Sequence, residues 1–358
     1  MSKRVMIMAG GTGGHIFPAL AVATCLREQG HQVTWLGTKR GLEARVVPAA
    51  GFDIEWLSVS GLRGKGVMAL LLAPFMLFKA CWQAAEIIRK RKPNVVLGLG
   101  GFVAGPGGLM ARLNGCPLVI HEQNRIPGTT NRLLAKVATR VLEAFPGSFK
   151  KEVRAVSTGN PLRKEIELVS TVKKEPKSST DKFNLLVIGG SLGAAILNET
   201  VPAALNKLND LSRLAVVHQS GERTVSLAKA AYDKVKVNVE VLPFIDDMAK
   251  QYQWADLVIC RAGAMTVSEV AAAGLPAIFV PLPHAIDDHQ TANARYLADA
   301  EAAILMPQQD FRAEKLASML EQLMSDREIL SGMAVRAGEM ASMEATVNVA
   351  SICIEEAN

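Results

Sequence analysis

The sequence predicts an α/β protein made of two doubly wound, parallel-sheet domains of the Rossmann-like kind. Short apolar segments without a polar break alternate with helix-length segments, which is typical of parallel strands buried on both faces. A strand followed by a glycine-rich turn opens the chain, and a similar strand and turn begin at residue 183. The polar segment 163–182 separates the two series, which indicates two domains.

Length and composition agree with this prediction. The chain has 358 residues, of which 49% are hydrophobic and 21% charged, so it is long enough for two or three globular domains, each with its own core. Its five cysteines are scattered without a C-x-x-C pair, which indicates reduced thiols rather than a disulfide framework or a zinc site. A predicted strand begins within the first residues, so we expect no signal peptide.

Charge is distributed unevenly between the two halves. Residues 1–160 contain 21 Lys and Arg against 8 Asp and Glu, a net charge of +13, whereas the remaining residues carry a net charge of −7. The basic half is therefore expected to meet an anionic partner such as lipid headgroups or phosphates. Nucleic acid is not expected, because aromatic residues make up only 5% of the chain and no DNA-binding motif occurs.

The first strand and turn form the motif around which the N-terminal half is organised. Residues 5–9 are the predicted strand, residues 10–14 read Gly-Gly-Thr-Gly-Gly, and a helix follows. This order points backbone N–H groups and a positive helix end at an anion, although the spacing is not that of G-x-G-x-x-G. His15 ends the turn with a side chain that transfers protons near neutral pH; the alternative is a histidine that only caps the helix.

Four further strands are predicted in the first half, at residues 32–36, 54–57, 95–97 and 117–120. The last of them leads into the sequence His-Glu-Gln-Asn at residues 121–124. Because ligands bind outside the carboxyl ends of parallel strands, we expect His15, Glu122 and Asn124 to lie at one edge of the sheet.

Five strands are predicted in the second half, at residues 183–188, 214–217, 239–242, 257–260 and 277–280. The first leads into Gly-Gly-Ser-Leu-Gly-Ala at residues 189–194, which repeats the strand and turn of residues 5–14. Each domain is therefore predicted to have its own anion-binding turn. The two turns would line a cleft if the domains face one another.

Two polar stretches of the second half also carry chemistry. A helix start at residues 264–269 could hold a diphosphate, with Glu269 accepting hydrogen bonds from a ribose diol; the compatible alternative is a capping box of Thr266 and Glu269. The cluster 287–293 contains two aspartates and a histidine. They are adjacent and no D-x-D occurs, so we expect no metal there and a polar-ligand contact, chiefly through Gln290.

An apolar segment, residues 67–78 from Val67 to Phe78, is flanked by Arg63, Lys65, Lys79 and the basic run 89–92. It is shorter than the ~20 residues that a transmembrane helix needs. One interpretation is a helix buried in the core. The other is a helix that lies in a membrane interface, because an apolar face ringed by cations is typical of attachment to anionic lipid.

Ten motifs in order along the chain resemble the MurG family of bacterial peptidoglycan glycosyltransferases. They are MAGGTGGHIFPALAVA, SGLRGKG, GLGGFVAGPGG, HEQNRIPGTTNR, TGNPLR, GGSLGA, HQSG, FIDDMA, CRAGAMTVSE and DHQTANA. The resemblance covers nearly the whole chain and implies the GT-B fold, in which two Rossmann-like domains face each other across a cleft.

The resemblance also implies an activity. It is the inverting transfer of N-acetylglucosamine from UDP-GlcNAc to the C4 hydroxyl of the muramyl sugar of lipid I, which yields lipid II and UDP for peptidoglycan synthesis, cell shape and cell division. No metal or other cofactor is expected. The implied partners are UDP-GlcNAc, lipid I, the cytoplasmic face of the inner membrane through residues 67–78, and other proteins of cell-wall synthesis.

Carried over onto matching positions, the resemblance implies His15 as the general base, with Glu122 as an alternative acid–base group. The residues implied to bind UDP-GlcNAc are Thr12, Gly13, Gly14, Asn124, Arg163, Ser191, Ile245 through its backbone, Ala264, Met265, Thr266, Val267, Ser268, Glu269 and Gln290. Phe102 departs from the family, which more often has tyrosine there, so no hydroxyl role is assigned to it.

These expectations define the domains. Residues 1–162 are expected to form an acceptor- and membrane-facing domain, 163–182 a linker, and 183–340 the UDP-GlcNAc-binding domain. Residues 341–358 are expected to form a C-terminal helix that packs back on the N-terminal domain.

Two other functions remain open at this point. A nucleotide-dependent oxidoreductase would explain the opening motif, but it would place an acidic residue at the end of the second strand, which ends at Gly37 and Thr38. A UDP-GlcNAc 2-epimerase, or a transferase with a soluble acceptor, would keep the donor site without needing the apolar and basic segment.

Overall fold

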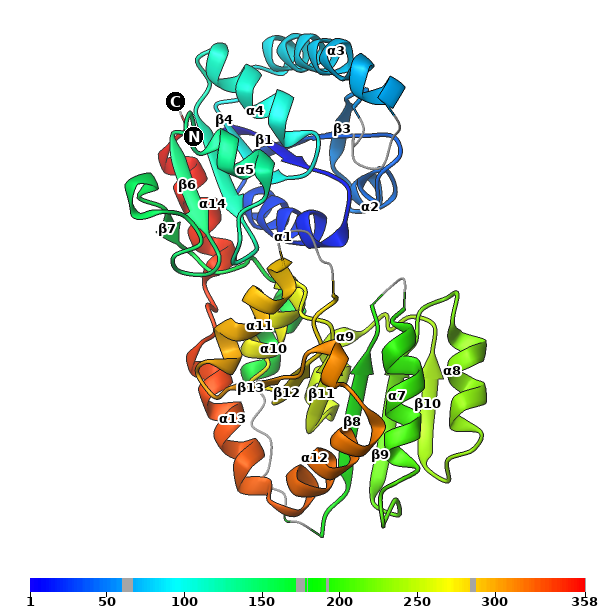
Figure 1. Cartoon of the computed structure of the whole chain (residues 1–358). Helices are drawn as coiled ribbons and strands as arrows, with labels where there is room; N and C mark the ends of the chain where they lie inside the picture. The colour runs from blue at the N-terminus through cyan, green and yellow to red at the C-terminus, as the bar shows by residue number, and fades with distance from the viewer. Residues whose placement is uncertain (60–66, 172–177, 179, 191–192, 284–287, 358) are drawn as a thin grey trace. The chain divides into compact units, whose positions relative to one another are not determined.

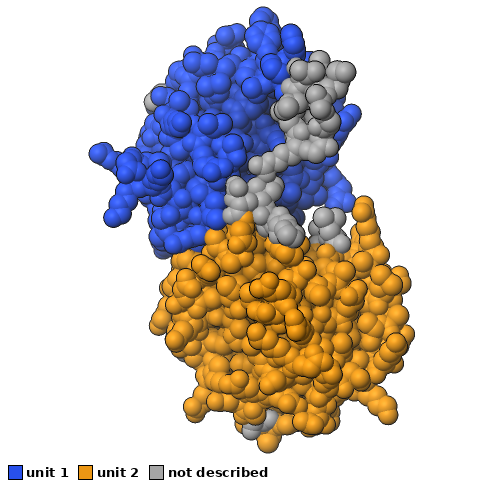
Figure 2. All heavy atoms as spheres, in the orientation of Figure 1, with its two compact units in different colours: residues 1–163, 342–358 blue, residues 164–341 orange. Residues whose placement is uncertain are grey.

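The structure, a computed structural model, describes the chain apart from residues 60–66, 172–177, 179, 191–192, 284–287 and 358. The chain divides into two compact units (Figure 2). Unit 1 comprises Met1–Arg163 together with Ser342–Asn358, and unit 2 comprises Lys164–Ala341.

Unit 1 is built on a parallel sheet with the strand order β3-β2-β1-β4-β5-β6-β7. Its strands are β1 (Arg4–Ala9), β2 (Gln32–Gly37), β3 (Asp53–Trp56), β4 (Val95–Gly100), β5 (Leu118–Glu122), β6 (Arg140–Glu143) and β7 (Val156–Ser157). Its helices are α1 (Gly13–Glu28), α2 (Glu43–Ala49), α3 (Val67–Arg91), α4 (Ala104–Leu113), α5 (Thr129–Leu134), the 3-10 helix η1 (Lys151–Val153) and α14 (Ala345–Glu355).

Alternation along β1 explains how this sheet is covered on both faces. Val5 and Ile7 belong to a core that includes residues of α1 and α14, whereas Met6 and Met8 belong to a second core with residues of α3 and α4. Figure 1 shows the sheet of unit 1 between these two groups of helices. The strand is apolar at every position because both of its faces are buried.

Unit 2 repeats the plan with the strand order β10-β9-β8-β11-β12-β13, again all parallel. Its strands are β8 (Phe183–Ile188), β9 (Leu214–Gln219), β10 (Asn238–Leu242), β11 (Leu257–Cys260), β12 (Ala277–Phe279) and β13 (Ala303–Leu305). Its helices are α6 (Lys164–Glu167), η2 (Leu168–Thr171), α7 (Ala195–Leu205), α8 (Val225–Tyr232), α9 (Met248–Trp254), α10 (Ala264–Ala272), α11 (His289–Ala298), η4 (Gln308–Asp310), α12 (Ala313–Ser325) and α13 (Arg327–Glu339).

The predicted fold class of two parallel-sheet, Rossmann-like domains is therefore confirmed. In each sheet the strand order reverses once, between β1 and β4 in unit 1 and between β8 and β11 in unit 2. Ligands of such sheets bind at the carboxyl ends of the strands beside this reversal. Three strands were not predicted from the sequence: β6, β7 and β13, of four, two and three residues.

The segment 163–182 differs from the irregular linker that its composition suggested. Its first residues form α6 and η2, which contact α10 and α9 of unit 2. Ile166 and Val169 are both buried, and their spacing of three places them on one helical face. Charged neighbours on either side hide this pair in the sequence.

Residues 342–358 complete unit 1 rather than unit 2. Helix α14 packs against α1, and Val349, Ala350 and Cys353 are buried in the same core as Val5 and Ile7. The Thr346 hydroxyl donates a hydrogen bond of 3.1 Å to the carbonyl oxygen of Leu162. This bond joins the end of the first segment of unit 1 to the start of its second segment.

Among the helices of the described residues, none is long and apolar enough to cross a membrane.

Candidate functional site

The glycine turn after β1 lies at the strand reversal of unit 1. The end of β4 approaches it so closely that a Cβ on Gly101, whose φ is +79°, would collide with the carbonyl oxygen of Gly10. A Cβ on Gly100, whose φ is +104°, would lie 3.1 Å from the His15 ring. Glycine at both positions therefore lets β4 close over the turn and brings backbone against the imidazole.

Helix α1 begins directly on this turn. Its first residue is Gly13, and Thr12 is the N-cap residue, without a hydrogen bond from its side chain to the helix. The N–H groups of a first helical turn have no acceptor within the helix, so those of Gly13 and Gly14 are available for an anion. Thr12 and Gly14 are both exposed, as a binding surface requires.

His15 is joined to β5 by a chain of hydrogen bonds. Its Nδ1 lies 2.7 Å from Oε1 of Gln123, and Nε2 of Gln123 lies 3.0 Å from Nδ1 of His121. Nε2 of His121 in turn lies 2.9 Å from the carbonyl oxygen of Gly159. Burial lowers the pKa of His121 to about 4, against the opposing effects of the Gly159 hydrogen bond and the Glu122 charge, so this imidazole is neutral at pH 7.

Glu122 is enclosed in the loop that follows β5. Its side chain is almost fully buried, and one carboxylate oxygen accepts hydrogen bonds from the backbone N–H and side-chain amide of Asn124, at 2.9 and 3.2 Å. The other accepts from the Gly128 N–H at 3.0 Å and from the Asn131 amide at 2.9 Å. Four hydrogen-bond donors on one buried carboxylate indicate that Glu122 holds the loop after β5 in place. Because its oxygens are already occupied, this arrangement counts against Glu122 as the catalytic base.

The remaining unit 1 residues lie at the same end of the sheet. Asn124 is held by Glu122, and its carbonyl oxygen accepts a hydrogen bond from Ser148 at 3.2 Å. The guanidinium of Arg163 lies over the Phe17 ring of α1, 5.7 Å from its centroid. Gln123, which lies between Glu122 and Asn124, contacts His15, so these residues meet at the carboxyl ends of β1 and β5. Thr12, Gly13 and Gly14 lie beside His15 at the start of α1, and their binding roles, like that of Arg163, stay predictions.

In unit 2 the turn after β8 lies at the corresponding place. Gly189 donates its N–H to the Gln219 carbonyl at 2.9 Å, and a Cβ on Gly193 would collide with the Ser220 carbonyl oxygen. Ser191 lies outside the described residues. The turn is therefore held close to the loop that follows β9.

A second turn of unit 2 leads into α10, and here one alternative from the sequence is wrong. The helix begins at Ala264 with Gly263 as its N-cap residue and no side-chain cap. Thr266 is inside the helix, so Thr266 and Glu269 do not form a capping box. The Glu269 carboxylate instead accepts a 2.9 Å hydrogen bond from the Tyr252 hydroxyl of α9 and remains half-buried.

The other donor-site candidates of unit 2 are spread over neighbouring loops. Met265, Thr266 and Ser268 are half-buried on α10, whereas Ala264 and Val267 are buried. Ile245 is buried in the loop between β10 and α9. Gln290 accepts a hydrogen bond of 2.9 Å from the Leu282 N–H, and Asn293 anchors α11 to the Ala262 carbonyl at 3.2 Å, so these loops converge on the start of α10.

Sequence analysis missed several residues that hold the site. Buried Glu43 accepts hydrogen bonds from the Gly11 N–H at 3.1 Å and from both the N–H and hydroxyl of Thr38, at 3.0 and 2.7 Å. Arg261 donates to the carbonyls of Val280 and Pro281 and to Gln308. Neither residue belongs to a recognisable motif: Glu43 lies six residues after the end of β2, and Arg261 directly follows β11.

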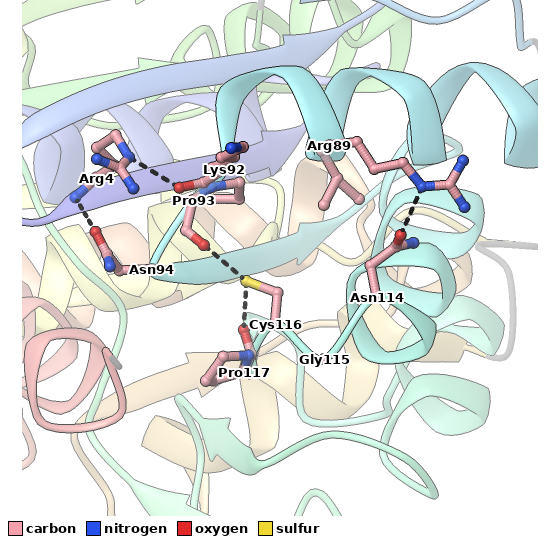
Figure 3. Close-up of a pocket in the computed structure, with 10 residues that line it drawn as sticks. Arg4, Arg89, Lys92, Pro93, Asn94, Asn114, Gly115, Cys116 and Pro117 are labelled. Atoms are coloured by element: carbon pink, nitrogen blue, oxygen red, sulfur yellow. Dashed lines mark hydrogen bonds between the residues drawn. The ribbon is translucent and has the colours of Figure 1, made fainter.

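Metal ligands are not grouped in the part of the chain that the structure describes: no three His, Cys, Asp or Glu side chains lie together as a metal site needs. Asp287, in the cluster 287–293, lies outside that part. A cavity of about 440 Å³ is found at the opposite edge of unit 1, beside Arg4, Asn94 and Pro117 (Figure 3). Because it adjoins the amino ends of β1, β4 and β5, it is not part of the candidate site.

Comparison with known proteins identifies the family. Residues 5–143 match the N-terminal domain of glycosyltransferase family 28, and residues 184–349 match its C-terminal domain. The chain is 56% identical over 357 residues to the UDP-N-acetylglucosamine–N-acetylmuramyl-(pentapeptide) pyrophosphoryl-undecaprenol N-acetylglucosamine transferase of Methylococcus capsulatus, covering 100% of this chain and 99% of that protein. It is 53% identical to the protein of the same name from Nitrosococcus oceani, with all of both chains covered.

A crystal structure gives the same result for the fold. MurG from Acinetobacter baumannii superposes with a TM-score of 0.84 at 44% sequence identity and covers 99% of each chain. The fold class predicted from the motifs is thereby confirmed, and the oxidoreductase alternative is set aside. The chain belongs to glycosyltransferase family 28, in the branch that contains MurG.

Proposed function

We propose that this glycosyltransferase moves N-acetylglucosamine from UDP-GlcNAc to the C4 hydroxyl of the N-acetylmuramyl sugar of lipid I, with inversion at the anomeric carbon. The observation that carries the proposal is 52 to 56% identity, over the full chain, with transferases named for this reaction. The product, lipid II, would enter peptidoglycan synthesis and so serve cell shape and division.

The chemistry requires a base for the acceptor and stabilisation for the leaving group. A sugar hydroxyl is a poor nucleophile, and His15 accepts its proton at Nε2 while the oxygen attacks the anomeric carbon. The bond from that carbon to the diphosphate breaks, and the electron pair leaves with UDP. The free N–H groups at the starts of α1 and α10 are suited to stabilise this developing negative charge.

The donor is assigned mainly to unit 2. Ser191 and the turn into α10 would contact the diphosphate, Glu269 the ribose, the Ile245 backbone the uracil and Gln290 the sugar. Unit 1 would add Thr12, Gly13, Gly14, Asn124 and Arg163. Support comes from the placement of the described members at carboxyl strand ends beside the strand reversals.

Product analysis tests the reaction. Labelled UDP-GlcNAc is incubated with the enzyme, with and without a lipid I analogue, and the products are separated. Transfer of label to the acceptor with release of UDP is expected only when both substrates are present. Formation of the 2-epimer of the donor in the absence of acceptor would instead establish the epimerase alternative.

We further propose that α3 attaches unit 1 to the cytoplasmic face of the inner membrane. Its Phe75, Phe78 and Trp82 side chains are 75%, 69% and 67% exposed, and their spacing of three and four places them on one helical face. This exposure argues against the buried-core interpretation of residues 73–78; the side chains of 67–72 are outside the described part. Helix α4, which contacts α3, adds the exposed apolar residues Leu109 and Leu113. Leu133 of α5, which contacts α4, and Val137 after α5 are also exposed.

The basic residues near α3 are not equally suited to meet lipid. Lys90 and Arg91 are paired with Glu55, at 3.6 and 2.7 Å, so they are already partly neutralised. Lys79, Arg112 and Lys136 are exposed beside the apolar residues. Arg63 and Lys65 lie outside the described residues. Each cation near an anionic surface contributes about 1 kcal/mol, weakened by salt over a Debye length of roughly 8–10 Å.

Vesicle co-sedimentation tests the attachment. Replacing Phe75, Phe78 and Trp82 by serine should reduce binding to anionic vesicles while turnover of a short-chain, water-soluble acceptor continues. The matched control replaces Leu227, Val335 and Val347, which are exposed elsewhere, by serine. Equal binding by both variants would contradict the assignment to α3.

Other proteins of cell-wall synthesis are expected as partners of the membrane-attached enzyme.

A further inference from the structure

In the chain of hydrogen bonds that runs from Gly159 through His121 and Gln123 to His15, the donor and acceptor of each bond can be deduced by starting at Gly159. The carbonyl oxygen of Gly159 can only accept, so the Nε2 of His121, 2.9 Å away, must carry a proton. Because His121 is a neutral imidazole, its other nitrogen, Nδ1, is then an acceptor. The first link of the chain therefore has a single possible tautomer.

The second link inherits this direction. Nε2 of Gln123 lies 3.0 Å from His121 Nδ1 and 2.9 Å from the His121 carbonyl oxygen, and both of these groups are acceptors. The amide NH₂ of Gln123 must face them, so its Oε1 faces His15 at 2.7 Å. An amide oxygen only accepts, which requires a proton on Nδ1 of His15.

Burial preserves this order of donors and acceptors from Gly159 to His15. His121 is 0% and Gln123 is 1% exposed, so water does not compete for their hydrogen bonds. Gly159 has a φ of +80°, and a Cβ there would collide with Ser342, so glycine is needed for the backbone conformation that presents the carbonyl to His121. The Asn160 amide also holds the Gln123 carbonyl, at 3.1 Å.

We propose that Gln123 and His121 are positioning residues that hold His15 in its Nδ1–H tautomer, so that Nε2 is the basic nitrogen offered to the acceptor hydroxyl. The proposal rests on the proposed role of His15 as the base. In water a neutral imidazole prefers the opposite, Nε2–H form. The relay from Gly159 therefore selects the form in which the ring nitrogen that is not bound to the protein can take a proton.

Nitrogen NMR of the full chain with ¹⁵N-labelled histidine side chains tests the tautomers without an activity assay. The signals of His15 and His121 are assigned with His15→Ala and His121→Gln variants, and the spectra are recorded as a pH series that extends to alkaline pH. We expect the Nδ1–H form for His15 and the Nε2–H form for His121. An Nε2–H or averaged signal from His15 in the unaltered enzyme would overturn the proposal, whatever the variants do.

Variants of Gln123 test the consequence for the reaction. Gln123→Met removes the acceptor at similar size; kcat should fall about 10- to 100-fold and the KM for UDP-GlcNAc should change less than about 2-fold. Gln123→Glu keeps an oxygen that accepts from His15 Nδ1 but loses the donor to His121, so it should retain the Nδ1–H tautomer and an activity between those of Gln123→Met and the unaltered enzyme. Ser157→Ala, which removes a nearby 3.0 Å hydrogen bond to Glu143 outside the relay, is the control.

The outcomes separate the two proposals. A drop in kcat for Gln123→Met without any change in the His15 tautomer would overturn the positioning role. Full activity of His15→Ala, with the Nδ1–H tautomer present in the unaltered enzyme, would overturn the base and leave the hydrogen-bond relay standing. If Gln123→Met does not fold, the NMR measurement on the unaltered enzyme still decides the tautomer.

Discussion

Units 1 and 2 share one sheet plan but use their buried histidines differently. In unit 1, His121 passes hydrogen bonds through Gln123 to the half-buried His15 at the sheet edge. In unit 2, His218 lies 3.0 Å from Asn198 and 2.9 Å from the Tyr232 hydroxyl, and all three are buried. The network of unit 2 therefore ends inside the protein, whereas that of unit 1 ends at a side chain that a substrate can reach.

The unit 2 network supports backbone rather than a reactive group. Asn198 donates to the Ser220 carbonyl at 3.1 Å and to the Thr224 hydroxyl at 3.0 Å, and these are the groups that pack behind Gly193. A buried neutral histidine thus stabilises a loop behind the glycine turn in unit 2. One sheet architecture can therefore end a buried polar network either at a half-buried imidazole, as at His15, or inside the protein behind a glycine turn, as at His218.

We expect the largest effect on activity from removing the His15 side chain, at which the hydrogen-bond network of unit 1 ends. His15→Ala should lower kcat by about 10²- to 10⁴-fold and leave the KM for UDP-GlcNAc nearly unchanged, because a general base acts in the transition state. His31→Ala removes another histidine of unit 1 and should retain activity. Steady-state kinetics on both variants measures the difference. Full activity of His15→Ala would transfer the base role elsewhere.

A smaller effect is expected from the binding surface of unit 2. Glu269→Ala should raise the KM for UDP-GlcNAc by a factor that corresponds to about 1.5–3 kcal/mol, because the carboxylate proposed to accept hydrogen bonds from the ribose is lost. Tyr252→Phe removes the neighbouring 2.9 Å donor and keeps the carboxylate, so its KM should change less. A lower melting temperature of Glu269→Ala with an unchanged KM would assign the residue to packing alone.

A separate effect, on stability rather than on catalysis, concerns the two buried histidines together. Burial lowers the pKa of His121 to about 4 and that of His218 to about 3, whereas both would be near 6.5 in the unfolded chain. Between these values the unfolded chain binds protons that the folded chain does not. The free energy of unfolding should therefore fall as the pH is lowered below about 6.5, by at most about 1.4 kcal/mol per pH unit for each histidine.

Urea unfolding from pH 7.5 to pH 5 measures this slope. His218→Gln should make it shallower by removing one of the two groups. The same slope in the variant and the unaltered protein would show that His218 does not contribute to it.

The sequence by itself determined the architecture and the family. Uninterrupted apolar segments such as residues 5–9 predicted parallel strands because strands buried on both faces cannot alternate. The glycine turns at residues 10–14 and 189–194 predicted where the strands end, and the ten motifs predicted the glycosyltransferase family. These features are local: they follow from the backbone needs of a turn or from the burial of one segment.

Only the tertiary structure decided which side chains act together. His15 and Gln123 are 108 residues apart and meet because β1, β4 and β5 are neighbours in the sheet. The Thr-x-x-Glu pattern at Thr266 suggested a cap, but the helix starts earlier and Glu269 meets Tyr252 instead. Local patterns specify backbone conformation, whereas the partner of a polar side chain depends on which distant segment packing places within hydrogen-bond distance.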